Sequence, residues 1–166
     1  KDDFVNGLSV EGVSEISSAA VSVDINLTVI GKAIEQKCQI IISHHPIIAK
    51  PLSSINGLMA RKLGLLMKSG ISVYVAHLPL DIHKKYSHSN QITYELGMYG
   101  VTRFGSVHGN FLGFHGYFRK PVLLEELKGI VEKKLGTKCQ IFPFGKAENG
   151  KIGVISGSGG FAVEEA

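Results

Sequence analysis

The chain has 166 residues, of which 44% are hydrophobic and 19% are charged, and this balance is typical of a globular protein. The composition excludes a disordered chain, and no apolar run reaches the roughly 18 residues that a membrane-spanning helix needs. The formal charge of +4 comes from scattered lysines, which permit nucleic-acid binding without supporting it. With only Cys38 and Cys139, a disulfide framework is excluded, and we expect a reducing, cytoplasmic compartment.

Strands and helices alternate along the first part of the sequence. Apolar residues recur with a helical period in some segments and form short β-branched runs in others. We expect strands at 8–10, 20–25, 40–43 and 72–76, and helices at 27–37, 57–68 and 90–97. This order predicts a mainly parallel sheet with right-handed crossovers.

The second part of the sequence begins near Gly105 and has a different pattern. Glycines alternate with aromatic residues over 111–118, which favours an antiparallel strand. A helical stripe follows, and we expect it at 123–135, with further strands at 140–144 and 151–155. The sequence therefore predicts an α/β protein of two packed αβ lobes, residues 1–104 and 105–166, the second incomplete at its C-terminal end.

Two of the predicted strands end in residues that bind metals. The run 40–43 is followed by His44, His45 and a proline that cannot continue the strand, and a β-branched run of this kind predicts a strand buried on both faces. The run 71–76 is followed by His77 and, four residues later, Asp81. Open α/β sheets bind their ligands at the carboxyl ends of the strands, so these side chains are a candidate metal site.

The spacing of these residues favours two ions over one. Adjacent residues in an extended chain point to opposite sides, so His44 and His45 suit two neighbouring ions. Asp81 offers the oxygen ligand that Fe, Mn or Zn accepts beside imidazole. The alternatives are a hydrogen-bonded histidine pair in a loop and a turn or helix cap at Asp81. Asp24 either accepts a hydrogen bond from an imidazole or caps the helix that follows.

Two weaker features are consistent with a phosphorylated substrate. His83 is next to two lysines, and an exposed surface loop is the simpler explanation, although basic groups there would suit the mouth of a phosphate-binding cavity. Ser158 and Gly159 lie in a glycine-rich segment after a predicted strand, as a phosphate-binding turn would. A tight turn of small residues is the alternative, and the segment lacks the pattern of a P-loop. We interpret His88, His108 and His115 as structural or surface residues.

Four segments together resemble those of the NIF-three-like proteins, also called type 2 GTP cyclohydrolase I. The first three together are specific to this family, whereas the glycine-rich fourth is weak alone. In order along the chain they are Val5–Gly12, Ile42–Pro46, Ala76–His83 and Gly157–Gly160.

The resemblance implies a two-lobed fold, a dinuclear centre of two divalent ions, and a toroidal homohexamer. It implies that His44 and His45 each bind one ion, that Asp81 is the carboxylate ligand, and that His77 lies beside the site. It also implies further ligands from a His-x-x-x-Glu element beyond the glycine-rich turn. This sequence contains no such element. We therefore expect the chain to be a fragment with an incomplete metal site.

These observations lead to competing functional hypotheses. The first is a metal-dependent hydrolase of a nucleotide or related small molecule, similar to the GTP cyclohydrolase of the family, with a phosphorylated small molecule as its substrate. The second is a non-catalytic metal-binding module with a regulatory or interaction role. Nucleic-acid binding is a third, although the sequence shows no reading helix or aromatic platform. We expect a homo-oligomer and no membrane partner.

Overall fold

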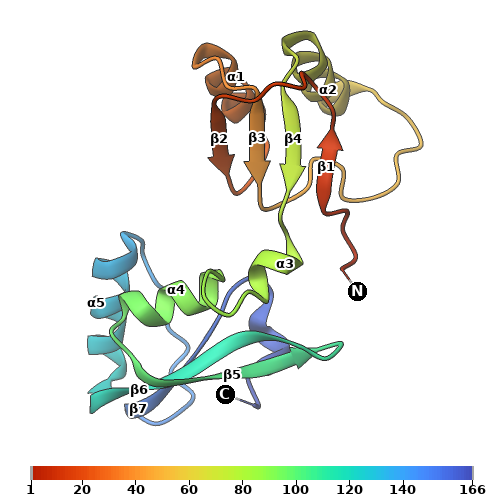
Figure 1. Cartoon of the computed structure of the whole chain (residues 1–166). Helices are drawn as coiled ribbons and strands as arrows, with labels where there is room; N and C mark the ends of the chain where they lie inside the picture. The colour runs from red at the N-terminus through yellow and green to blue at the C-terminus, as the bar shows by residue number, and fades with distance from the viewer. Residues whose placement is uncertain (1, 166) are drawn as a thin grey trace. The chain divides into compact units, whose positions relative to one another are not determined.

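The computed structural model describes residues 2–165 and contains two compact units, the first ending at Leu80 and the second beginning at Asp81. The boundary expected from the sequence pattern lies later, between residues 104 and 105. The structure divides earlier because helix α4 (His88–Glu95) packs on strands β6 (Asn110–Leu123) and β7 (Glu148–Ile155) of the second unit. Each unit is described by itself (Figure 1).

The first unit is built around a four-stranded sheet in the order β1-β4-β3-β2 (Figure 1). Strands β2, β3 and β4 are parallel to one another, and β1 pairs with β4 in the antiparallel direction. Helices α1 and α2 make the crossovers, so the predicted parallel sheet is confirmed. The elements are β1 Gly7–Val10, β2 Ala19–Ser22, α1 Leu27–Glu35, β3 Ile40–Ser43, α2 Gly57–Ser69 and β4 Ser72–Val75.

Helix α1 begins, and helix α2 ends, at a residue suited to that position. The Asn26 side chain accepts a hydrogen bond from the backbone N–H of Val29 at 2.9 Å and so caps the start of α1. Gly70 ends α2 in the left-handed conformation, with φ of 64°. A Cβ atom on Gly12 would collide with the carbonyl oxygen of Gly70, so only glycine fits at position 12. Within residues 2–165, no helix is both long and apolar enough to cross a membrane.

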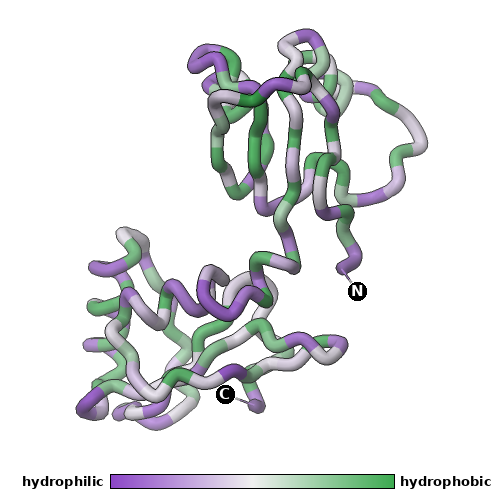
Figure 2. The backbone as a smooth tube through the Cα atoms, viewed as in Figure 1, coloured by the Kyte–Doolittle hydropathy of each residue, from purple (hydrophilic) through white to green (hydrophobic). Residues whose placement is uncertain are grey.

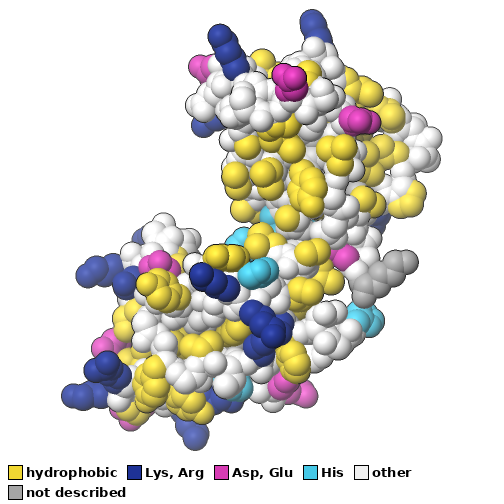
Figure 3. Space-filling model, in the orientation of Figure 1, with side chains coloured by type: hydrophobic (Ala, Val, Ile, Leu, Met, Phe, Trp, Pro, Cys, Tyr) yellow, Lys and Arg dark blue, Asp and Glu magenta, His cyan; other side chains and the backbone are white. Residues whose placement is uncertain are grey.

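The two faces of this sheet differ in burial. On the helix side, Ile41 and Val73 pack against α1 and α2 and have no accessible surface. On the opposite face, four side chains lie side by side across the strands and stay exposed, and we call them the open apolar row: Leu8 (54% exposed), Tyr74 (45%), Ile42 (36%) and Val21 (81%). Figure 3 shows the hydrophobic patch, and Figure 2 shows the apolar strands beneath it. The expectation that β3 is buried on both faces is wrong for the residues described.

The second unit is a three-stranded antiparallel sheet, in the order β5-β6-β7, with α4 and α5. The helix predicted at 123–135 and the strand predicted at 151–155 are confirmed. The segment 140–144 is not a strand, because β7 pairs with β6 instead, and Phe142 and Phe144 remain exposed. Strand β5 was not predicted. The remaining elements are α3 Leu78–Asp81, at the boundary of the two units, β5 Tyr99–Val107, α5 Leu124–Leu135 and the 3₁₀ turn Gly159–Ala162.

The difference between the two faces can be tested with neighbouring residues of β3. We expect Ile41→Ala to lower the free energy of unfolding by about 3 kcal/mol, because it leaves a cavity in the core. Ile42→Ala should cost only about 1 kcal/mol, because its side chain is already partly in water. Urea unfolding followed by circular dichroism measures both values. Equal losses of unfolding free energy in the two variants would contradict the exposure of the open apolar row.

Candidate metal centre

Backbone hydrogen bonds hold the adjacent histidines in the bend that follows β3. The backbone N–H of His44 donates to the carbonyl oxygen of Ser22 at 3.1 Å, and that of His45 donates to the carbonyl oxygen of Val23 at 2.8 Å. Both residues are therefore held alongside the segment that follows β2. The structure places them at the carboxyl end of the sheet, where the sequence predicted them.

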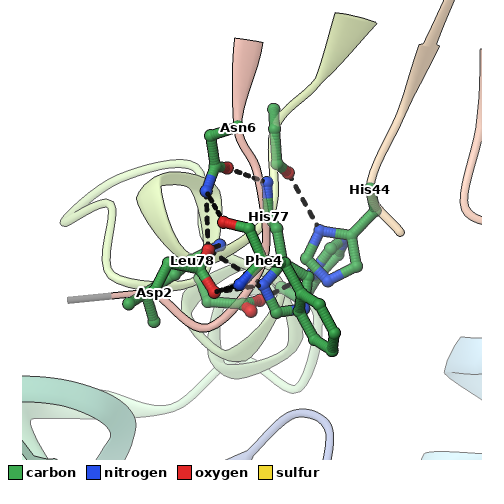
Figure 4. Close-up of polar contacts among 9 residues, drawn as sticks. Asp2, Phe4, Asn6, His44, His77 and Leu78 are labelled. Atoms are coloured by element: carbon green, nitrogen blue, oxygen red, sulfur yellow. Dashed lines mark hydrogen bonds and ion pairs between the residues drawn. The ribbon is translucent and has the colours of Figure 1, made fainter. Parts of the chain in front are cut away.

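His77 reaches the same end of the sheet from the neighbouring strand, β4. Its backbone N–H donates to the side-chain oxygen of Asn6 at 2.7 Å. The Phe4 ring packs edge-on against the imidazole, with ring centroids 4.7 Å apart. The segment that precedes β1 therefore holds His77 on one side, as Figure 4 shows.

The three imidazoles of this end form one cluster. The centroid of the His44 ring lies 4.8 Å from that of His45 and 5.0 Å from that of His77, and the His45 and His77 centroids lie 5.9 Å apart. One ring nitrogen of each residue lies within 4.8 Å of one ring nitrogen of each of the others. Imidazole nitrogen suits Zn, Fe and related divalent ions, so this donor set fits the implied metal.

Each imidazole in the cluster also has an oxygen acceptor at its Nδ1 atom. Because carbonyl and carboxylate oxygens only accept, Nδ1 carries the proton in these contacts, and in the neutral ring Nε2 has the lone pair that a metal needs. Metal-binding histidines in proteins are oriented by this kind of hydrogen bond. The pairs are His44 Nδ1 with the Ala76 carbonyl at 3.0 Å, His45 Nδ1 with Asp24 Oδ1 at 2.8 Å, and His77 Nδ1 with Asp2 Oδ2 at 3.1 Å.

Asp24 was a candidate for one of two roles, a hydrogen bond to an imidazole or the cap of the following helix. It lies two residues beyond β2, which is shorter than the strand expected at 20–25. The alternative role as helix cap is wrong, because Asn26 caps α1. Its carboxylate faces the His45 ring instead, and both side chains remain accessible to solvent.

Asp2 is part of this cluster and was not a candidate in the sequence. Its carboxylate accepts hydrogen bonds from the Asn6 side chain at 2.7 Å and from the backbone N–H groups of Phe4 and Leu78 at 3.1 and 3.0 Å, besides the contact with His77 (Figure 4). Burial acts to raise the pKa of Asp2, but these hydrogen bonds outweigh it and lower the pKa to about 2. A partly buried, ionised carboxylate therefore supports the imidazole of His77.

Asp81 is the last residue of α3 and the first residue of the second unit. Its Oδ1 atom lies 3.4 Å from Nδ1 of His88, the first residue of α4. His88 was interpreted as a surface residue, but its contact with a candidate ligand makes it a candidate partner of the site. That Asp81 joins His44 and His45 in one centre stays a prediction.

His83 is held in an exposed loop of the second unit. Its Nδ1 atom accepts hydrogen bonds from the backbone N–H groups of Lys85 and Tyr86, at 3.1 and 3.0 Å. The neutral ring therefore carries its proton on Nε2, which can donate to an anionic ligand but cannot bind a metal in this tautomer. The role of His83 in substrate binding stays a prediction.

The glycine-rich segment around Ser158 and Gly159 has a packing role. A Cβ atom on Gly159 would collide with the side chain of Ile155, so the turn needs glycine for close approach. At the start of the segment, the backbone N–H of Ser156 donates to Oγ of Ser89 at 2.9 Å, which ties the turn to α4. These contacts explain the segment as a tight turn of small residues. Phosphate binding there stays a prediction.

The lowered pKa of Asp2 predicts how the effect of Asp2→Asn on the free energy of unfolding depends on pH. The folded-state pKa is about 2, below the ordinary value of 3.8, so ionised Asp2 stabilises the fold fully above about pH 4. This contribution is lost as the pH falls through about 2. The difference in the free energy of unfolding between wild type and Asp2→Asn should therefore be largest near neutral pH and should shrink below pH 4. Urea unfolding across this range measures it, and a difference independent of pH would contradict the prediction.

A model of the family described as Duf34/NIF3 (NGG1p interacting factor 3) matches residues 2–166. The chain is 38% identical over 166 residues to the GTP cyclohydrolase 1 type 2 homolog of Pyrococcus horikoshii, and the match covers 99% of this chain and 66% of that protein. It is 32% identical over 161 residues to the protein of the same name from Archaeoglobus fulgidus, covering 97% of this chain and 64% of that protein.

A solved structure agrees with these relatives. The protein TTHA1606 from Thermus thermophilus matches with a TM-score of 0.84 at 28% identity, and the match covers 100% of this chain and 66% of that chain. This chain thus spans slightly less than two thirds of the length of these two curated relatives. The resemblance drawn from the four sequence segments is confirmed, and the chain belongs to the Duf34/NIF3 family.

Proposed function

We propose that the chain carries the metal-binding part of a metal-dependent hydrolase that acts on a nucleotide or related small molecule. The observation that supports this most strongly is the cluster of His44, His45 and His77, in which each Nδ1 atom has an oxygen acceptor. A purely structural histidine cluster does not need three rings oriented in this way. The name of the relatives, GTP cyclohydrolase 1 type 2 homolog, supports the same class of reaction.

The ligands proposed are His44, His45 and Asp81, and they would hold two divalent ions of Fe, Mn or Zn. Bound ions of this kind lower the pKa of a coordinated water toward neutrality and act as Lewis acids toward the substrate. The chain's own residues orient the ligands. Asp24 holds the His45 ring by a 2.8 Å hydrogen bond, and the Ala76 carbonyl holds the His44 ring at 3.0 Å.

Basic groups of the second unit support an anionic substrate. The protonated Nε2 of His83 can donate to a phosphate oxygen, and Lys84 and Lys85 next to it are exposed. The Lys85 ammonium lies 5.1 Å from the centroid of the Tyr86 ring, which orients it through a cation–π contact. Such groups attract nucleotides through their phosphates without selecting a base.

Ligand variants test the proposal by linking metal content to turnover. We expect this chain, as part of a protein that also carries a His-x-x-x-Glu element and is loaded with Mn, Fe or Zn, to hydrolyse at least one member of a panel of nucleotides, with products measured by chromatography. His45→Ala should lower the bound metal and abolish turnover. Asp81→Ala should abolish turnover and leave at most one equivalent of metal. Both losses should exceed the roughly 10–100-fold effect of residues that only orient metal ligands.

His108→Asn is the matched control, because it removes an exposed imidazole from a loop position with φ of 49°, which asparagine tolerates. It should leave metal content and turnover unchanged. If the loaded protein hydrolysed nothing in the panel while still binding metal through His45, the non-catalytic metal-binding module would replace the hydrolase.

A further inference from the structure

We propose that the second unit binds single-stranded nucleic acid on one face of its sheet, with Tyr99 and Tyr117 stacking on bases and Lys151 next to a phosphate. This inference is independent of the hydrolase proposed above, because it uses none of the residues assigned there to metal or substrate. The sequence alone shows no aromatic platform, since the two tyrosines come from different strands. The pairing of β5 with β6 assembles one.

Tyr99 and Tyr117 are neighbours across the two paired strands. They are in register, and their ring centroids lie 6.0 Å apart with an interplanar angle of 39°. Residues in register across paired strands point to the same face of a sheet. The two residues are 53% and 41% exposed, respectively. A Cβ atom on Gly100 would lie 3.3 Å from the Tyr117 ring, so the glycine leaves room for that ring. Two accessible rings therefore lie together on this face.

Three further side chains share this face with the tyrosines. Tyr117 is also in register with Lys151 of β7, and His115, two residues before Tyr117, points to the same side. Thr102 is in register with His115, and its hydroxyl is hydrogen-bonded to Nε2 of that ring. We call Tyr99, Thr102, His115, Tyr117 and Lys151 the tyrosine face, and all of them except the half-buried His115 are exposed.

Helix α4 packs on the opposite face of this sheet. Side chains alternate along β7, so Ser156, just beyond the end of the strand, belongs to the face opposite Lys151. The Ser156 hydroxyl oxygen lies 3.1 Å from that of Ser89 in α4, and Figure 1 shows α4 along one side of the sheet. The tyrosine face is therefore accessible to a ligand without any movement of α4.

The charges on the strands suit a polyanion. Strands β5, β6 and β7 carry four basic residues and one acidic residue, which are Arg103, Arg119, Lys120, Lys151 and Glu148. Arg103 donates to two backbone carbonyls, whereas the other three basic residues are exposed.

Lys151 supplies the positive charge of the tyrosine face. Burial lowers the pKa of His115 below its ordinary value of 6.5, and the nearby charge of Lys151 lowers it further, while Glu165 acts in the opposite direction. The His115 imidazole is therefore neutral at pH 7. A phosphate beside the tyrosines would meet the ammonium group of Lys151 and not a second cation from His115.

Two accessible rings on an open sheet select single strands over duplexes. Bases in a duplex stack on one another, whereas unpaired bases can turn outward and stack on aromatic side chains. Stacking tolerates every base, because each base has a π-face, and a cation beside the rings contacts the backbone. We therefore expect binding that depends on strandedness and on salt more than on sequence.

The experiment measures, by fluorescence anisotropy, how the whole 166-residue protein binds labelled oligothymidylate and oligouridylate of about 12 nucleotides. A chelator is present, so that a bound metal plays no part. We expect both single strands to bind, and a duplex of the same length to bind at least about 10-fold more weakly. Tyr99→Ala and Tyr117→Ala should each lower the affinity by about 5- to 150-fold, which is the effect of losing one stacked base.

Matched variants separate stacking from charge and from folding. Lys151→Gln should reduce the slope of log affinity against log salt by about 0.7, the value for one phosphate contact of a single strand. Tyr94→Ala is the control, because Tyr94 is 77% exposed but lies on α4, and it should bind as the wild type does. If circular dichroism shows that an alanine variant does not fold, Tyr99→Leu or Tyr117→Leu replaces it, with the same expected loss.

The inference is overturned if the wild type binds no single strand, if the duplex binds as tightly, or if both tyrosine variants keep the wild-type affinity. It is also overturned if Tyr94→Ala loses as much affinity as Tyr99→Ala. Tyrosine variants that dissociate an oligomer in analytical ultracentrifugation, without any strand binding in the wild type, would assign the face to contacts between copies. Strand binding without hydrolysis of any nucleotide would sink the proposed function alone, and hydrolysis without strand binding would sink this inference alone.

Discussion

Backbone hydrogen bonds just beyond the ends of the parallel strands determine where the imidazoles lie. The N–H groups of His44 and His45 bind carbonyls beyond β2, and the N–H of Ala76 binds the carbonyl of Ser43 at 2.9 Å. The end of β3 and the two residues after it are thereby hydrogen-bonded to both neighbouring segments. The sheet thus positions the residues of the site. Helices α1 and α2 stabilise the sheet by burying one of its faces.

The partly buried carboxylate of Asp2 is the second element on which the site depends. Taking Asp2 out of water costs free energy, and only its hydrogen bonds to Asn6, Phe4, Leu78 and His77 offset that cost. Each of these partners loses an acceptor if Asp2 moves. The segment before β1 and the residues after β4 are therefore coupled through one side chain, so that a change at the beginning of the chain acts on His77.

Local patterns in the sequence predicted the parts of the fold and site that depend on neighbours in the chain. The run 40–43 followed by His44 and His45 predicted a strand and the position of its histidines, and both are confirmed. Asp2 could not be predicted, because it meets His77 across 75 residues through a segment without periodicity. Strand β5 was missed and 140–144 was wrongly predicted as a strand, since pairing with β6 decides which segments are strands.

The stability of the first unit depends on whether another molecule covers the open apolar row. Fully burying an aliphatic or aromatic side chain is worth roughly 1.5–3 kcal/mol, and Leu8, Ile42, Tyr74 and Val21 leave a large part of this unrealised. By mass action, any molecule that binds this face of the folded sheet, including a detergent or a hydrophobic dye, raises the melting temperature in proportion to the logarithm of its concentration once the face is nearly saturated. Melting temperatures of this protein are therefore comparable only when measured at the same protein and additive concentrations.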